Sequence, residues 1–193
     1  MLSIAVLVSG TGTNLQAVMD YTKRPEVDAC VKTVVCDREG AYAIQRARND
    51  GIESWVLERK RYKKTLSDKI LEKTRPCDLI ILAGFLSILT GEILKVFENR
   101  IINVHPSLIP SFCGPQMYGQ KVHEAALKKG VKISGCTVHI VDEGTDTGRI
   151  LVQKAVEVAE DDTPQSLAQR ILPYEHEALC EAIEMFIKKK RHI

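Results

Sequence analysis

The stretch IAVLVSGTGTN, residues 4–14, begins with five apolar residues, a run too short for a helix and typical of a buried strand. Glycines at 10 and 12 then predict a tight turn, and a helix should follow from Asn14. Outward from this stretch, short β-rich runs alternate with longer amphipathic segments through the first hundred residues. This alternation is typical of a parallel sheet covered by crossover helices, so the sequence predicts an α/β fold.

Further elements follow from the same patterns. We expect strands over 31–36, 54–57, 79–83, 101–105, 134–141 and 150–158, and helices over 41–50, 60–73 and 120–129. Thr163 and Pro164 open a last helix that runs towards Lys190, and Pro173 should break or kink it just before Glu175. No repeat, linker or domain boundary is visible, so we predict one domain over residues 1–193.

Composition excludes several classes of protein. The chain has 193 residues and a net charge of +2, which implies no nucleic-acid surface, and its longest apolar stretch is far too short to cross a membrane. The N-terminus lacks a basic leader. The six cysteines form no C-x-x-C pair, so we expect reduced thiols, a cytoplasmic protein and no metal site.

The turn after the first strand is a candidate phosphate site. Backbone N–H groups and the positive end of the helix converge where the strand gives way to the helix. Thr11, Thr13 and Asn14 add hydrogen-bond donors, and Gly12 lets an anion come close to the backbone. A P-loop is excluded because no Gly-Lys-Ser/Thr follows. Asp37 resembles the acid that holds a ribose in dinucleotide sites, but the third glycine of that fingerprint is missing. A tight turn without a ligand remains the alternative.

Two further segments carry groups suited to acyl chemistry. Asn103 and His105 share one face of a predicted strand, where an amide can hold an oxyanion and an imidazole can carry a proton. The loop 142–148 contains Asp142, Glu143 and Asp146. If Asp146 faces His105, its charge raises the pKa of the histidine and fixes its tautomer. A structural histidine and a solvated loop are the alternatives. The other histidines, at 123, 139, 176 and 192, are interpreted as structural or solvated.

Taken together, these segments resemble the phosphoribosylglycinamide formyltransferase family over nearly the whole chain. The resemblance rests on SGTGTNLQ at 9–16, LAGF at 82–85, NVHPSLIP at 103–110 and TVHIVDEGTDTG at 137–148. It implies a Rossmann-like formyltransferase fold: an open, mostly parallel, twisted sheet with helices on both faces and antiparallel strands in the C-terminal half. The N-terminal half would bind phosphate and the C-terminal half would bind folate and carry the catalytic residues.

The resemblance implies formyl transfer from 10-formyltetrahydrofolate to the amino group of glycinamide ribonucleotide, in purine synthesis. Catalysis would fall to Asn103, protonated His105 and Asp146, and Glu175 would lie near the substrate amine and glycinamide. The phosphate would lie on Thr11, Gly12, Thr13 and Asn14. The residues implied for folate binding are Lys64, with Lys63 as the alternative, Phe85, Leu86, Ser87, Ile88, Leu89, Asn103, Val141, Asp142 and Asp146.

Three positions depart from the family pattern. Ser87 stands where arginine is common, Cys113 where proline is common before Gly114, and Arg149 where proline is usual.

Two other formyltransferase-fold activities remain open, namely hydrolysis of formyltetrahydrofolate and formylation of initiator tRNA. A nucleotide-binding regulatory module that uses Gly10, Gly12 and Asp37 is the alternative from another class. The expected partners are the two small-molecule substrates, without nucleic acid or membrane, in a monomer or homodimer.

Overall fold

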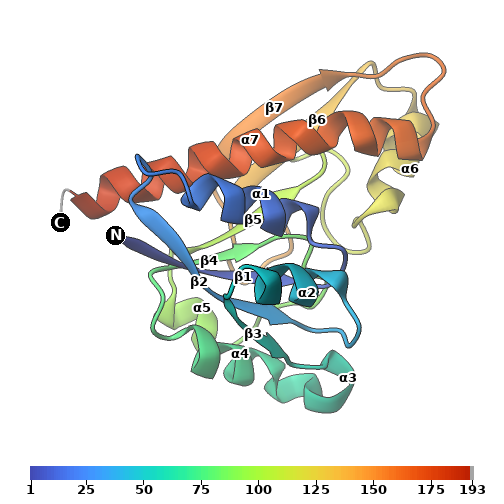
Figure 1. The fold of residues 1–193 in the computed structure, drawn as a ribbon. Coiled ribbons are helices and arrows are strands. Elements are labelled where there is room, and N and C mark those ends of the chain that lie inside the picture. The colour runs from blue at the N-terminus through green and yellow to red at the C-terminus, as the bar shows by residue number, and fades with distance from the viewer. Residues whose placement is uncertain (192–193) are drawn as a thin grey trace. The chain divides into compact units, whose positions relative to one another are not determined.

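The computed structural model describes residues 1–191, and Figure 1 shows the course of the chain. The strand order in the sheet is β3-β2-β1-β4-β5-β6-β7. The strands are β1 Leu2–Val8, β2 Ala29–Cys36, β3 Glu53–Val56, β4 Leu79–Leu82, β5 Ile101–His105, β6 Ile133–Ile140 and β7 Ile150–Glu157. The predicted α/β class is confirmed: β1 pairs in parallel with β2 and β4, whereas β6 and β7 are antiparallel.

The helices lie between the strands along the chain. They are α1 Thr13–Thr22, α2 Tyr42–Asn49, α3 Arg59–Tyr62, the 3-10 helix η1 Lys63–Thr65, α4 Leu66–Thr74, α5 Glu92–Val96, α6 Gln120–Lys129 and α7 Pro164–Arg191. In residues 1–191 no helix combines the length and the apolar character needed to cross a membrane.

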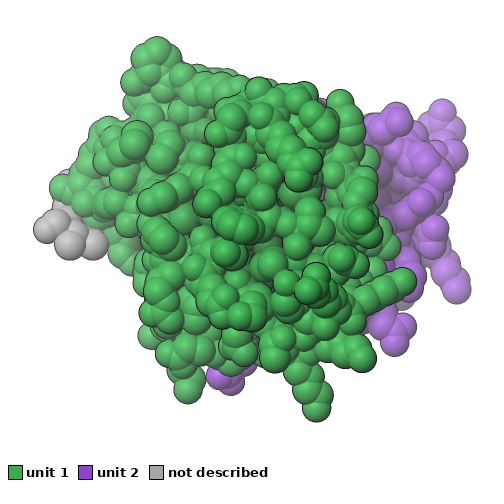
Figure 2. Space-filling model, turned by 60° about the horizontal axis from the view of Figure 1, so that its bottom comes forward, with its two compact units in different colours: residues 1–102, 185–193 green, residues 103–184 purple. Residues whose placement is uncertain are grey.

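The chain divides into two compact units, which Figure 2 colours separately. Unit 1 comprises residues 1–102 and the chain from Met185 onward, and unit 2 comprises residues 103–184. The expectation of one domain over the full chain stays a prediction.

In unit 1 the core is a parallel sheet. Ile4–Val8 is fully buried, with Ile4 opposite Val31 on β2 and Leu79 on β4. A strand covered on both faces has no polar face, which explains the uninterrupted apolar run. Right-handed crossovers place α1 and α2 on one face as the chain steps from β1 to β2 to β3, and the return to β4 places α4 on the other. Both α1 and α4 contact β2 (Figure 1).

In unit 2 an antiparallel pair and a long loop shape the candidate site. The β6–β7 pair runs from Ile133 opposite Glu157 to His139 opposite Ile150, with an irregularity after Val138. Residues 141–149 connect these two strands, and residues 106–119 connect the end of β5 to α6. Both connections begin where a strand ends, so polar side chains at these points can converge.

The last helix differs from the expectation. Helix α7 does not end at Pro173, and the break predicted before Glu175 is therefore wrong. Proline removes one helical hydrogen bond and crowds the preceding turn. Here buried residues on either side of Pro173, among them Leu167, Ile171 and Leu179, anchor both halves of the helix, and this packing outweighs the local penalty.

Candidate active site

Strand β5 positions the amide and the imidazole that the sequence singled out. Asn103 and His105 are two residues apart on the strand, so their side chains leave the same face. His105 is buried, with only 4% of its surface exposed. Nδ2 of Asn103 lies 3.1 Å from Nε2 of His139 on β6, which fixes the orientation of the carboxamide.

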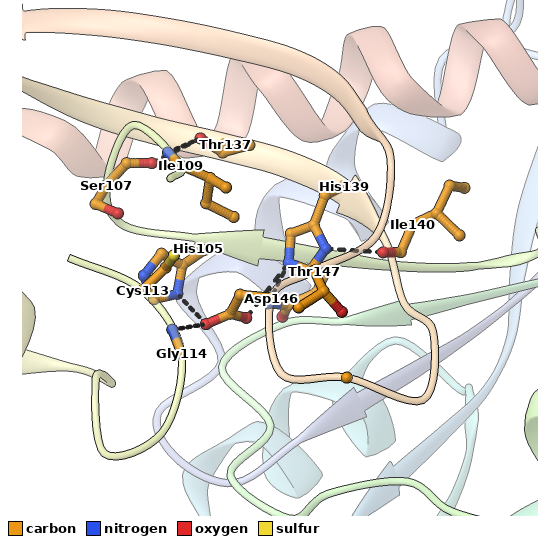
Figure 3. A network of polar contacts seen from close by, with 12 residues as sticks. His105, Ser107, Ile109, Cys113, Gly114, Thr137, His139, Ile140, Asp146 and Thr147 are labelled. Carbon is orange, nitrogen blue, oxygen red and sulfur yellow. Dashed lines mark hydrogen bonds and ion pairs between the residues drawn. The ribbon is translucent and has the colours of Figure 1, made fainter. Parts of the chain in front are cut away.

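Asp146 joins these residues from the loop between β6 and β7. Its Oδ2 lies 3.6 Å from Nδ1 of His105, and its Oδ1 lies 3.5 Å from Nε2 of His139. The backbone N–H of Gly114 donates to Oδ2 at 2.9 Å. Figure 3 shows the carboxylate between the two imidazoles and the Gly114 nitrogen. The structure therefore brings together Asn103, His105 and Asp146, which come from separate stretches of the chain.

The surroundings of Asp146 keep it ionised. Burial by itself would raise the pKa of Asp146. The contact with His139 at 3.5 Å, the hydrogen bond from the Gly114 N–H and the charge of His105 together outweigh burial, so the pKa of Asp146 lies below its ordinary value. At neutral pH the loop therefore presents a carboxylate, and not a neutral acid, to both histidines.

Hydrogen-bond partners define what each imidazole can do. Nδ1 of His139 donates to the carbonyl of Ile140 at 2.8 Å, so in the neutral ring Nε2 accepts a hydrogen bond from Asn103. This leaves the second N–H of Asn103 for another acceptor. Nε2 of His105 donates to the carbonyl of Phe112 at 2.9 Å, and Nδ1 faces Asp146. Each nitrogen of the His105 ring thus faces an oxygen acceptor.

Asp142 shapes the acidic loop from within. Its Oδ1 accepts hydrogen bonds from the N–H of Gly144 at 3.0 Å and from Oγ1 of Thr147 at 2.6 Å. Asp146 follows with a positive φ of 59°, a conformation that few non-glycine residues adopt. The carboxylate of Asp142 therefore stabilises the turn that aims Asp146 at the histidines, and Val141 lies half-buried at the start of the loop.

The loop after β5 is held by one buried hydroxyl. Oγ1 of Thr137 donates to the carbonyl of Ser107 at 2.7 Å and accepts from the N–H of Ile109 at 3.1 Å. Gln153 adds bonds to Thr137 and to the carbonyl of Ile109. These contacts fix the chain that follows His105 and so limit the freedom of the catalytic candidate.

Glu175 lies on α7 and is 9% exposed. Its charge acts on Cys136 of β6: burial first, and then the charge of Glu175, raise the pKa of that thiol to about 12. Cys113, in the loop beside Asp146, also has a raised pKa because of burial and then of the Asp146 charge. Both thiols are therefore protonated at neutral pH.

In unit 1 the expected phosphate loop joins β1 to α1. Gly12 has a φ of 76° and lies against α2, where a Cβ would come within 2.8 Å of the Ala43 Cβ. Only glycine fits this position without displacing its neighbours. No side chain caps the N-terminus of α1 at Gly12. Nε of Arg46 donates to the carbonyl of Thr11 at 2.9 Å, which places a cation beside the loop. Thr13 and Asn14 form the first turn of α1.

The expected folate segment also belongs to unit 1. Phe85 and Leu89 are buried, whereas Leu86 and Ile88 are 41% and 69% exposed. Oγ of Ser87 donates to Asp37 at 2.5 Å, so this side chain points back into the unit. Lys64 lies exposed in η1, at the end of the basic stretch 59–64. An anchored segment with two exposed apolar side chains offers a surface for a flat apolar ring.

Sequence reasoning missed two members of the cluster. His139 was interpreted as structural or solvated, yet it contacts both Asn103 and Asp146. Its place two residues after Thr137 was the available signal, because both side chains then leave the same face of β6. The N–H of Gly114 had no signal in the sequence. His192 lies outside the described residues. Among residues 1–191 no group of three or more His, Cys, Asp or Glu side chains is placed to hold a metal ion.

Comparison with known proteins identifies the family. The formyl transferase family model matches residues 2–183. The phosphoribosylglycinamide formyltransferase of Bacillus subtilis strain 168 is 40% identical over 191 residues, which cover 97% of this chain and 95% of that protein. The chain belongs to the phosphoribosylglycinamide formyltransferase family. The fold agrees: the crystal structure of glycinamide ribonucleotide transformylase 1 from Symbiobacterium toebii has a TM-score of 0.92 at 39% identity, covering 98% of this chain and 89% of that one.

The family also includes longer proteins. The trifunctional purine biosynthetic protein adenosine-3 of Gallus gallus is 39% identical over 189 residues, which cover 95% of this chain but 18% of that protein. The chain thus spans about a fifth of the length of such relatives. The family resemblance in the sequence, built on the motifs at 9–16, 82–85, 103–110 and 137–148, is confirmed.

Proposed function

We propose that the protein transfers a formyl group from 10-formyltetrahydrofolate to the amino group of glycinamide ribonucleotide, giving formylglycinamide ribonucleotide and tetrahydrofolate in purine biosynthesis. One observation carries this proposal: in a chain of this family, an ionised Asp146 lies 3.6 Å from His105, with Asn103 in the same hydrogen-bonded cluster. Formyl transfer through a tetrahedral intermediate needs an oxyanion donor and a proton carrier, and these three residues supply both.

The proposed chemistry follows from the groups present. The substrate amine attacks the formyl carbon, and a tetrahedral intermediate with a negative oxygen forms. The free N–H of Asn103 and the imidazolium of His105 stabilise this oxygen, and the carboxylate of Asp146 stabilises the imidazolium. The bond from the formyl carbon to the folate nitrogen then breaks, and a proton from the amine reaches that nitrogen by way of the cluster.

Substrate contacts are proposed for the remaining residues. Thr11, Gly12, Thr13 and Asn14 bind the phosphate through backbone and side-chain donors. Glu175 binds the amine or the glycinamide. Folate contacts are proposed for Phe85, Leu86, Ser87, Ile88 and Leu89, for Asn103, Val141, Asp142 and Asp146, and for Lys64, with Lys63 as the alternative. For Ser87 the contact would come from its backbone, because the side chain is bonded to Asp37.

Other features bear on the setting of the reaction. All six cysteines are free thiols, which supports a reducing compartment, and we propose the cytoplasm. The nucleotide-binding module is disfavoured because Asp37 is 1% exposed and bonded to Ser87, so its carboxylate does not face solvent as a ribose acceptor would.

A direct assay tests the proposal. The purified protein is mixed with 10-formyltetrahydrofolate, and tetrahydrofolate release is followed with and without glycinamide ribonucleotide. We expect release only when the ribonucleotide is present, with formylglycinamide ribonucleotide formed in equal amount. Release without the ribonucleotide would instead indicate a hydrolase. No release in either case would contradict the proposed function.

A further inference from the structure

Asp37 is a buried carboxylate without an ion-pair partner among residues 1–191. It directly follows β2 and is 1% exposed. Its Oδ2 accepts a hydrogen bond from Oγ of Ser87 at 2.5 Å, and its Oδ1 has no hydrogen-bond partner in the described part of the chain. Burying a carboxyl oxygen without a partner is costly. Fold stability alone therefore gives a poor account of an aspartate at this position.

A second buried side chain holds the residue next to Ser87. Ser9 directly follows β1 and is 2% exposed, and its Oγ accepts a hydrogen bond from the N–H of Leu86 at 2.8 Å. Two polar side chains at the ends of β1 and β2 thus fix two successive residues of the 85–89 segment. Between them they set both the backbone path and the direction of the Ser87 side chain.

These bonds lie at a special point of the sheet. In unit 1 the strand order is β3-β2-β1-β4, so the chain steps away from β1 in both directions, and the loops after β1 and β4 diverge. Crevices at such points, outside the carboxyl ends of parallel strands, commonly bind ligands in α/β proteins. The Ser9–Leu86 bond joins the loop that leads into the phosphate residues to the segment expected to contact folate.

The exposure of the segment shows what these bonds control. Leu86 and Ile88 remain 41% and 69% exposed, while the neighbouring Phe85 and Leu89 are buried. If the Ser87 side chain lost its acceptor, the segment would retain its apolar anchors but gain freedom in the residues between them. The affinity of a ligand lying on this surface would fall, because binding would then have to order the segment.

We propose that Asp37 is a positioning residue for the folate co-substrate, acting through Ser87 on the 85–89 segment and leaving the formyl-transfer step to unit 2. This inference rests on the proposed function, in which the segment binds the pterin. It also gives a role to the serine at 87, a position where the family often has arginine: the side chain holds the segment from behind instead of reaching towards the ligand.

The test compares Asp37→Ala, which removes the acceptor, and Ser87→Ala, which removes the donor, with the wild type in steady-state kinetics. We expect KM for 10-formyltetrahydrofolate to rise about 5- to 20-fold in each variant, with kcat and KM for the ribonucleotide changed less than about twofold. The double variant should resemble the single ones, because both changes remove the same bond. Ser87→Thr retains a hydroxyl and should restore a near wild-type KM.

Thr33→Val is the matched control. Thr33 is a buried polar residue of β2, the strand that Asp37 follows, and is 1% exposed. Its hydroxyl donates to the Glu53 carbonyl on the neighbouring β3. It should lower the melting temperature without changing either KM. If Asp37→Ala and Ser87→Ala behave like this control, with melting temperature lowered and folate KM unchanged, the positioning role is wrong.

A binding measurement separates this proposal from the proposed function. Tetrahydrofolate is titrated into the wild type, Ser87→Ala and Asp37→Ala, and Kd is read from intrinsic fluorescence. Weaker binding in the variants supports the positioning role even if the wild type transfers no formyl group, a result that would overturn the proposed function alone. Equal Kd values in all three proteins, or no binding by the wild type, would overturn the positioning role. Ser87→Ala alone is sufficient for this test if Asp37→Ala does not fold.

Discussion

The candidate catalytic cluster of unit 2 depends on contacts between side chains, whereas the phosphate loop of unit 1 depends on backbone conformation. In the cluster, side chains from distant stretches of the chain meet: Asp146, whose side chain is only 10% exposed, contacts both His105 and His139 and remains ionised. In the loop, backbone conformation dominates, with Gly12 at a φ of 76° against α2. Substitutions in the cluster should therefore lower the rate of the chemical step, and substitutions in the loop should lower the affinity for the ribonucleotide.

The largest effect is expected from Asp146→Asn. The amide retains the shape and can still accept from the Gly114 N–H, but the negative charge beside His105 is lost. We expect kcat to fall on the order of 10²–10³, with both KM values within about threefold. Steady-state kinetics at pH 7 measure this. A variant with a raised KM and an unchanged kcat would contradict the expected difference between the cluster and the phosphate loop.

Gly12→Ala tests the phosphate loop. The added Cβ would meet Ala43 at 2.8 Å in a backbone conformation that L-residues rarely adopt, so the loop must shift. We expect KM for the ribonucleotide to rise roughly 10-fold or more, about 1.4 kcal/mol, while kcat at saturation changes little.

Gly40→Ala is the matched control for the loop. Gly40 has a similar φ of 71°, but no atom lies within 4 Å of an added Cβ. It should cost about 1 kcal/mol of stability and leave KM unchanged. Equal KM values in the two alanine variants would show that crowding at Gly12 is irrelevant to binding.

His139→Gln should have a smaller effect on unit 2. The amide cannot both accept from Asn103 and approach Asp146 as the imidazole does, so the carboxamide of Asn103 loses part of its orientation. We expect kcat to fall about 5- to 10-fold, less than with Asp146→Asn. Rates measured with saturating substrates decide this. A fall as large as that of Asp146→Asn would make His139 a catalytic group in its own right.

The smallest effect concerns Asp78, a carboxylate of unit 1 at the opposite ends of the strands from the phosphate loop. Burial would raise its pKa, but hydrogen bonds from Lys190 and Ser3 lower it to about 2. Because this value lies below the unfolded pKa of about 3.9, the stabilisation is complete above about pH 4 and is lost as the pH falls towards 2.

Asp78→Asn should accordingly lower the free energy of unfolding by about 1 kcal/mol at pH 7, a value discounted because Asp78 and Lys190 are 36% and 44% exposed. Urea unfolding at pH 7 and near pH 2.5 measures the difference, which should shrink at the lower pH. The formyl-transfer rate should not change. A lower kcat would mean that charges in unit 1 contribute to the chemistry, contrary to the comparison.

The sequence predicted the strands of the parallel sheet well because an apolar run buried on both faces is unambiguous. It did not predict α5, Glu92–Val96, which is a single short helical stretch with one fully buried residue, Ile93. The break at Pro173 was wrong because local propensity says nothing of the buried residues on either side. In each case the missing information is tertiary packing.

The candidate site was predictable in part for the same reason. Asn103 and His105 share a strand face, which the chain itself reveals. The approach of Asp146 to the histidines depends on the turn that Asp142 stabilises and on the Gly114 N–H. Neither contact can be predicted from the spacing of residues in the sequence. The bond between Asp37 and Ser87 joins residues 50 positions apart and was likewise invisible before the structure.

The central claim is that His105 carries out the chemistry and contributes little to the affinity for either substrate. Single-turnover formation of formylglycinamide ribonucleotide by His105→Ala, with both substrates saturating, tests it most directly. The account predicts that the rate constant falls at least about 100-fold while the Kd of each substrate stays within about threefold. A single-turnover rate equal to that of the wild type would contradict it.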